Sequence, residues 1–384
     1  MEFNSYSNYS LVTAILPRQS TAKVLDEVLS SGATHVLSMN ARGAVMQERW
    51  YQAFLPALSP EQEILYFLAP NVEVDHLMEQ IVMVGKLRLY GAGSIFATPC
   101  HELTCAEDYH LWKPGRYTFE SISFDINFKR DLVGLVHITD RDVAEPIAKA
   151  AIKAGAQGAT ITYMRGYGLR DRLGLLRITK KHDKELITVV VDQYDADAVF
   201  QAMSQAGHVD LPGRGLVYQL PISKGLTNLA SVFQKKKHSA SIQQMVRAID
   251  HLHGNTDWRA NQLLVHDPKA EEFAANTRGL SKELKLLNIL CLRKDAEVLL
   301  NLLLEFGVSG ASLSNWRMAE ADCELTDGGQ RLNREFACLS LLLGDVKVSG
   351  VSEFLQTTVS GKKMKEVCFF THAIPVAKTF ASIG

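Results

Sequence analysis

The chain has 384 residues, of which 47% are hydrophobic and 22% are charged, and its formal net charge is -1. This composition is ordinary for a globular protein of two or three domains, and the near-neutral charge gives no indication of a nucleic-acid or anionic-membrane partner. The N-terminal residues lack the basic-then-apolar pattern of a secretion signal, and no apolar run approaches the roughly 20 residues of a membrane span. Six cysteines are scattered without the spacing of a disulfide framework. We therefore expect a cytoplasmic protein that is not inserted in a membrane.

One pattern of strands and helices occurs three times along the chain. Each occurrence opens with an apolar strand-like run, at residues 11–16, 132–138 and 286–292. A stretch with apolar residues at helical spacing follows and stops at Gly32, Gly155 or Gly307, because glycine tolerates the positive φ of a helix end. A second strand, a polar loop, a third strand, a second helix and a last strand then come in the same order each time.

This order predicts an α+β fold of three tandem ferredoxin-like (βαββαβ) modules. The helices of such a module cover one face of its sheet and leave the other apolar face in need of a partner. We expect the three copies to supply that partner by packing together as an intramolecular pseudo-trimer.

The same pattern predicts the domain boundaries. The modules cover residues 1–103, 131–223 and 283–384, with a polar and aromatic connector at 104–130 and a helical insert at 224–282. The insert contains an amphipathic stretch from Ile242 to Leu252, and Ser241 with Gln244 is typical of a capping box. Its helix either docks on the modules or binds a partner, and the sequence leaves both open.

Glycine-rich motifs follow the strands of the first two modules. In the second module a strand ends in Arg165-Gly166-Tyr167-Gly168, and a later turn reads Gly213-Arg214-Gly215. The first module has Gly85-Lys86 followed by Gly91-Ala92-Gly93-Ser94-Ile95-Phe96. These motifs resemble the nitrogen-regulatory PII signalling family, in which a Gly-aromatic-Gly turn opens the T-loop and a Gly-Lys with Gly-x-Gly-x-Ile-Phe forms the B-loop.

The resemblance implies a function. Members of that family are homotrimers that bind adenine nucleotides in the clefts between subunits, and their T-loop grips a target such as a membrane transporter or an enzyme. It implies ATP, ADP or AMP as ligand and a regulated partner protein, and the residues themselves lead us to expect no metal. Glycine turns let backbone N–H groups converge on a phosphate, and lysine or arginine adds charge. The expected anion-binding residues are Gly85, Lys86, Gly91, Gly93, Arg165, Gly166, Gly168, Arg170, Gly213, Arg214 and Gly215.

The chain also departs from the family pattern. The lysine that follows the second B-loop glycine in the family is replaced here by Ser94 and Leu216. The third module reads Gly361-Lys362-Lys363-Met364 at this point and loses the glycine pattern. We therefore expect one or two working clefts and a structural, degenerate third module.

The loop from Arg165 to Lys184 is basic. Its seven basic and two acidic residues give it a net charge of +5. This charge either keeps a solvated loop soluble or attracts an anionic ligand or an acidic partner surface, and the sequence leaves both open.

Other functions have weaker support. The residues Cys100, His101, Cys105 and His110 do not have the spacing of a zinc site. No Ser, His and Asp grouping or nucleophile elbow indicates an enzyme. The alternative to a nucleotide sensor is an interaction scaffold on the same fold that binds no nucleotide. An RNA-binding module is disfavoured, because the strand from Leu186 to Val191 has no stacking aromatic residue.

Overall fold

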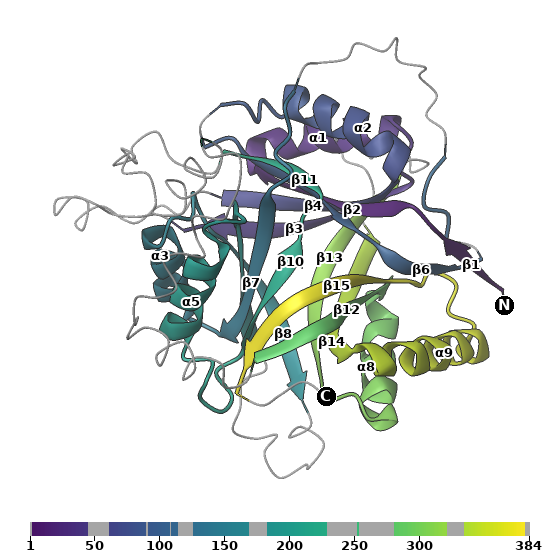
Figure 1. The fold of residues 1–384 in the computed structure, drawn as a ribbon. Coiled ribbons are helices and arrows are strands. Elements are labelled where there is room, and N and C mark those ends of the chain that lie inside the picture. Colours follow the sequence, from purple (N-terminus) through teal and green to yellow (C-terminus); the bar gives the residue numbers. More distant parts are fainter. Residues whose placement is uncertain are drawn as a thin grey trace.

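A computed structural model describes residues 2–44, 61–89, 91–107, 109–113, 126–168, 183–228, 252, 280–320 and 334–380 (Figure 1). The first part of the chain forms β1 (Phe3–Tyr6), β2 (Tyr9–Pro17), α1 (Arg18–Ser30), β3 (His35–Gly43), β4 (Glu61–Pro70), α2 (Asn71–Val84), β5 (Gly93–Pro99) and β6 (His101–Ala106). The middle part forms β7 (Leu132–Asp140), α3 (Ala144–Lys153), β8 (Thr160–Gly168), β9 (Asp183–Asp192), α5 (Ala196–Gly207), β10 (Leu216–Pro221) and β11 (Lys224–Asn228). The last part forms β12 (Leu280–Leu292), α8 (Arg293–Phe306), β13 (Gly310–Glu320), β14 (Arg334–Gly344), α9 (Asp345–Lys362) and β15 (Cys368–Thr379).

The described strands form one antiparallel sheet, part of which closes into a barrel. Nine strands complete the circuit in the order β10, β7, β9, β8, β3, β13, β14, β12, β15 and back to β10. The other six strands, β1, β2, β4, β5, β6 and β11, extend the sheet beyond the barrel. Strands far apart in the sequence therefore lie side by side.

The predicted fold class, three ferredoxin-like modules packed as an intramolecular pseudo-trimer, is wrong. The strands of the first, middle and last parts of the chain, which we call the first, middle (second) and third segments, hydrogen-bond to one another and close a barrel. They do not form three sheets that meet only through their faces. The physical reason is that β3, β8 and β13 are long strands, of 9, 9 and 11 residues. In separate modules the far part of each strand would have an unpaired edge, and here these parts hydrogen-bond to one another instead. The hydrophobic pattern predicts strands, but it does not say which edges pair.

The predicted helical insert falls mostly outside the described residues, at 229–251 and 253–279. Its first residues, Lys224–Asn228, form the strand β11, which pairs with β5. Nothing in the structure tests the predicted domain boundaries, which remain predictions.

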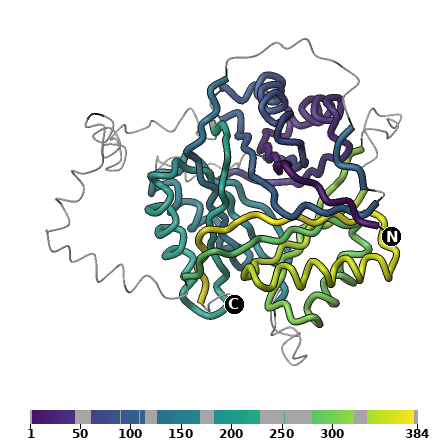
Figure 2. The backbone as a smooth tube through the Cα atoms, turned by 45° about the vertical axis from the view of Figure 1, so that its right-hand side comes forward, coloured from purple at the N-terminus to yellow at the C-terminus, as the bar shows by residue number. Residues whose placement is uncertain are grey.

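Three helix pairs lie on three sides of the sheet, as Figures 1 and 2 show. In the first pair, the buried faces of α1 and α2 pack against β4 through Val24, Val28, Leu77 and Met78. The predicted helix ends Gly32, Gly155 and Gly307 have φ angles of 124°, 125° and 109°, in the left-handed region where glycine is favoured.

Candidate anion-binding site

One glycine turn leads into β5 in the first segment, and the other leads into β10 in the middle segment. Gly91 and Gly93 have φ angles of 74° and 123°, and Gly213 and Gly215 have 75° and 109°. A Cβ atom at Gly93 would lie 2.1 Å from the carbonyl oxygen of Ile15, and one at Gly215 would lie 1.9 Å from that of Ile138. Backbone packing therefore requires glycine at these two positions, whether or not the turn binds a ligand.

Both turns border chain from a distant part of the sequence. Gly93 pairs with Asn228 of β11, and the Thr379 hydroxyl at the end of β15 donates a hydrogen bond of 3.0 Å to the Gly215 carbonyl. Gly85 ends α2, and the side chains of Lys86 and Arg214 are exposed. The turns thus lie at seams, which we define as the places where two of the three segments meet.

Three other predicted residues belong to β8, and one is not described. Arg165, Gly166 and Gly168 lie in the last part of this strand, where Arg165 pairs with Leu313 and Gly168 with Gly310 of β13. The expected Gly-aromatic-Gly turn is therefore strand up to Gly168. Arg170 and most of the basic loop, residues 169–182, lie outside the described residues.

Arginines occur at equivalent positions of the three long strands β3, β8 and β13. Each arginine lies opposite the same position of the next strand around the barrel. The pairs are Arg42 of β3 with Ile161 of β8, Arg165 of β8 with Leu313 of β13, and Arg317 of β13 with Ser38 of β3. Each arginine also follows a helix-ending glycine, Gly32, Gly155 or Gly307, by ten residues. We call Arg42, Arg165 and Arg317 the seam arginines.

Two seam arginines are bound to glutamates of the neighbouring segment. Arg42 Nη2 lies 3.2 Å from Glu185 Oε1, and Arg317 Nη2 lies 2.7 Å from Glu63 Oε1. Burial alone would lower the pKa of Arg42, but hydrogen bonds to Glu185 and Glu145 raise it above its usual value. These two pairs hold β3 to β9 and β13 to β4.

The third seam lacks the corresponding glutamate. Glu63 lies opposite Asn40 on β3 and Glu185 lies opposite Tyr163 on β8, whereas the residue in the same register on β14, opposite Asn315, is Ala337. Arg165 has instead an ion pair of 3.9 Å with Glu297, and the two side chains are 48% and 71% exposed. An ion pair that is this long and this exposed contributes little to the stability of the fold.

An open pocket of about 440 Å³ lies where β3, β8 and β13 meet. Its charged lining consists of Arg165, Arg293 and Arg317 against Asp183 and Glu335, an excess of one positive charge. The rest of the lining is neutral: the polar side chains of Ser38, Asn40, Tyr163 and Asn315, and the apolar or aromatic side chains of Met39, Met164, Leu313 and Trp316. The pocket therefore presents hydrogen-bond donors and a small positive excess beside Arg165.

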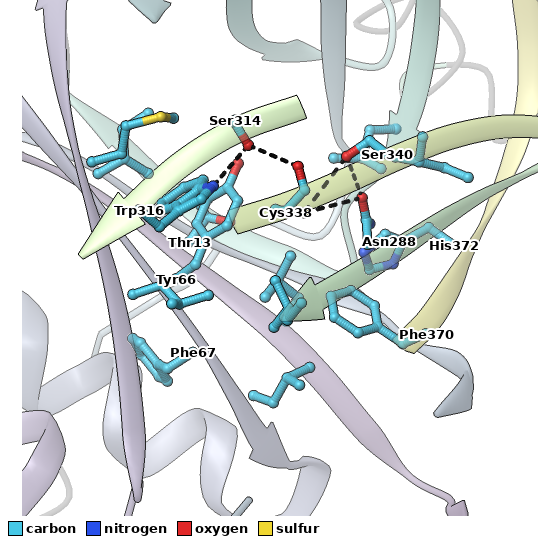
Figure 3. Close-up of a pocket in the computed structure, with 18 of the residues that line it drawn as sticks. Thr13, Tyr66, Phe67, Asn288, Ser314, Trp316, Cys338, Ser340, Phe370 and His372 are labelled. Atoms are coloured by element: carbon cyan, nitrogen blue, oxygen red, sulfur yellow. Dashed lines mark hydrogen bonds between the residues drawn. The ribbon is translucent and has the colours of Figure 1, made fainter. Parts of the chain in front are cut away.

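A smaller cavity of about 90 Å³ lies among the barrel strands (Figure 3). Trp316 Nε1 donates to Ser314 Oγ at 2.8 Å, and Ser340 Oγ donates to Asn288 Oδ1 at 2.7 Å. Met39, Met164 and Trp316 line both this cavity and the open pocket, so they separate the two spaces. The cavity is large enough for a few water molecules and too small for a nucleotide.

Comparisons with known proteins assign no family to the chain. No family model matches it, and no curated protein matches it. Among solved structures, it is similar to Arabidopsis thaliana PII bound to citrate, over 25% of this chain and 78% of that one, at 19% identity and a TM-score of 0.20. A similarity of this size does not establish a fold or a family.

Within the described ranges, no group of three or more His, Cys, Asp or Glu side chains is placed to hold a metal ion. None of the described helices combines the length and apolarity needed to cross a bilayer.

Arg165 is among the residues predicted from the sequence, whereas Arg42, Arg317 and their glutamates are not. A signal was present, since the ten-residue spacing from the helix-ending glycines is visible in the sequence. The glutamates gave no comparable signal, because only the strand register places them beside arginines of another segment.

Proposed function

We propose that the chain is a PII-like signal-transduction protein that binds an adenine nucleotide or another small anion at its seams and regulates a partner protein. The observation that carries the proposal is the position of the two glycine turns, each at a seam and each accompanied by an exposed basic side chain, Lys86 or Arg214. Turns of this kind can direct several backbone N–H groups at a phosphate. The proposed role is binding and regulation, without catalysis.

Regulation requires that the ligand bind one conformation better than another. A ligand at a seam contacts two segments at once. It therefore favours the conformation in which the binding groups of both segments can contact it. Ordering of charged loops by a bound anion then changes the surface offered to a partner, which we propose to be a transporter or an enzyme.

Calorimetric titration of the purified protein with ATP, ADP and AMP tests this proposal. We expect heat of binding with at least one nucleotide, and weaker binding after Lys86→Ala combined with Arg214→Ala. Lys362→Ala is the matched control, because it removes an exposed lysine near the corresponding turn of the third segment, which we expect to be structural. No heat with any of the three nucleotides would remove nucleotide binding from the proposal.

An interaction scaffold that binds no nucleotide is the second candidate. It is favoured by Gly93 and Gly215, whose Cβ positions are filled by backbone atoms, so that packing alone accounts for these glycines. The replacement of the family's lysine by Ser94 and Leu216 also favours it. The same titration separates the candidates, because a scaffold gives no heat with nucleotides.

A further inference from the structure

We propose that Cys105 and Cys368 form a reversible disulfide, a modification site that links the first segment covalently to the third. Cys105 lies in β6 and Cys368 is the first residue of β15. The two cysteines are 263 positions apart in the sequence, so that only the strand pairing brings them together. The proposal involves neither the glycine turns nor the seam arginines, and it is independent of the proposed function.

The strand register places the two cysteines where a disulfide can form. They lie directly opposite each other in the antiparallel pair of β6 and β15. The adjacent pair is hydrogen-bonded, because the Ala106 nitrogen donates to the Val367 oxygen at 2.8 Å, so the cysteines occupy a non-hydrogen-bonded position. At such a position the Cα atoms are about 4.5 Å apart, which is within the range that a disulfide spans.

The sulfur atoms of the two cysteines are already close together. Their Sγ atoms lie 2.6 Å apart, compared with about 2.05 Å in a formed disulfide. A shared zinc ion would lie about 2.3 Å from each sulfur in tetrahedral geometry and would hold the two atoms farther apart than this. The pair is therefore suited to a bond between the sulfurs rather than to a metal.

The surroundings of the pair protect it while β6 is in place. Both side chains are fully buried, in an apolar cluster that includes Leu103, Tyr109 and Phe370. Burial raises the pKa of the Cys368 thiol well above its usual value, which disfavours the thiolate. Because the thiolate is the form that reacts, oxidation requires that water and the oxidant first reach the pair.

The position of β6 allows this access without opening the barrel. Among the described strands, β6 lies outside the barrel, and only the four-residue strand β1 lies beyond it in the sheet. Its pairing with β15 is short and shifts register between Phe369 and Thr371. On its other side β15 pairs with β12 over a longer stretch, from Leu280 to Leu290. Local opening of β1 and β6 therefore exposes the thiols while β15 stays in place.

The oxidant that we propose is a small-molecule disulfide, such as glutathione disulfide. The thiolate of one cysteine attacks a sulfur of the oxidant, which gives a mixed disulfide and releases one small thiol. The other cysteine attacks the protein sulfur of the mixed disulfide, the bond between Cys105 and Cys368 forms, and a second small thiol leaves. The two cysteines lose two electrons and two protons, which the released thiols carry. An excess of the small thiol reverses the reaction, so in a reducing compartment the pair stays as two thiols.

Incubation of the full chain with glutathione disulfide tests the proposal, with reduced glutathione in the parallel sample. Free thiols are then blocked, the protein is digested without reduction, and the peptides are identified by mass spectrometry. We expect a linked peptide pair that contains Cys105 and Cys368 after oxidation only, and its loss on reduction. The thermal unfolding midpoint of the oxidised protein should be higher by roughly 5 °C or more, because the bond closes a long loop.

Two variants serve as comparison. Cys105→Ser should give neither the linked peptides nor the rise in the unfolding midpoint. The matched control Cys291→Ala removes another fully buried cysteine, which lies opposite Ala337 on the neighbouring strand, and should give both results as the unmodified protein does. The peptide map of the unmodified protein decides the matter if Cys105→Ser does not fold.

Three results would overturn the proposal. The first is that Cys105 and Cys368 remain reduced in the folded protein after oxidation. The second is a disulfide to another cysteine, such as Cys100, in place of this pair. The third is a linked pair with an unchanged unfolding midpoint, because the bond would then not restrain the two segments. None of these results bears on nucleotide binding, which the calorimetric titration decides separately.

Discussion

A buried histidine links the stability of the protein to pH. The ring of His137 lies between β7 and Gly207 of α5, and neither of its nitrogens has a hydrogen-bond partner among the described residues. Burial lowers its pKa from 6.5 to about 4. Between these two values the unfolded chain binds more protons than the folded one, so the free energy of unfolding falls as the pH falls from about 6.5 towards 4.

We predict that His137→Leu removes this part of the pH dependence. At pH 5 the histidine costs the folded state about 2 kcal/mol relative to neutral pH, and leucine has no proton to gain. Urea unfolding at pH 7 and pH 5 should show a difference between the two pH values that is smaller by about this amount in the variant. Burial also lowers the pKa of His372 to about 4, so this histidine makes stability depend on pH in the unmodified protein and in the variant alike. An unchanged pH dependence would contradict the prediction.

Substitutions at two glycines with the same φ angle distinguish the cost of backbone strain from the cost of a steric clash. Gly215 and Gly307 both have a φ of 109°, but a Cβ at Gly215 would meet the Ile138 carbonyl oxygen at 1.9 Å, whereas one at Gly307 would meet nothing within 4 Å. Gly307→Ala should therefore cost about 1–2 kcal/mol from the left-handed conformation alone. Gly215→Ala should cost more, roughly 3 kcal/mol or above, because the strand must also move. Urea unfolding measures both, and equal losses would show that the close approach is not a constraint.

At the scale of elements, the ion pair between Arg42 and Glu185 holds β3 against the second segment. Glu185→Ala removes the more buried of the two carboxylates that bind the Arg42 guanidinium, while Glu145 remains at 3.1 Å, and we expect a loss of about 2–3 kcal/mol of stability. The exposed pair of Arg18 and Glu61, at 60% and 77% exposure, is the control, and Glu61→Ala should cost at most about 1 kcal/mol. A double-mutant cycle with Arg42→Ala and Glu185→Ala measures the coupling, and a value no larger than that of the control pair would contradict this role.

Elements could be predicted from the sequence more completely than their assembly. The apolar spacing around Val24 and Val28 and the glycine after them predict α1 and its end, because the signal is local. The pairing of β3 with β8 and β13 joins residues more than a hundred positions apart, and no local pattern specifies it. The same limit applies to the site: the turn at Gly213–Gly215 is a local motif, whereas the contact of Arg317 with Glu63 exists only through the strand register.

The closed barrel makes the whole molecule dependent on contacts between segments. The middle segment contributes β7, β8, β9 and β10 to it, and both edges of this set are paired outside the segment, β8 with β3 and β13 and β10 with β15. The inward-facing side chains Val136 and Tyr218 are buried among residues of the third segment, Leu284, Leu286 and Ile374. Removing the other segments would expose two strand edges and an apolar face together.

We therefore predict that residues 131–223 expressed alone do not form a stable monomer. Open strand edges beside an apolar face favour association, so the fragment should self-associate or remain unfolded, whereas the full chain should unfold in one cooperative transition. Sedimentation velocity gives the state of the fragment, and far-ultraviolet circular dichroism with urea gives its cooperativity, with the full chain as control. A monomeric fragment that unfolds cooperatively would show that the segment folds without the barrel, and the edge pairing would then be a docking contact rather than a condition of folding.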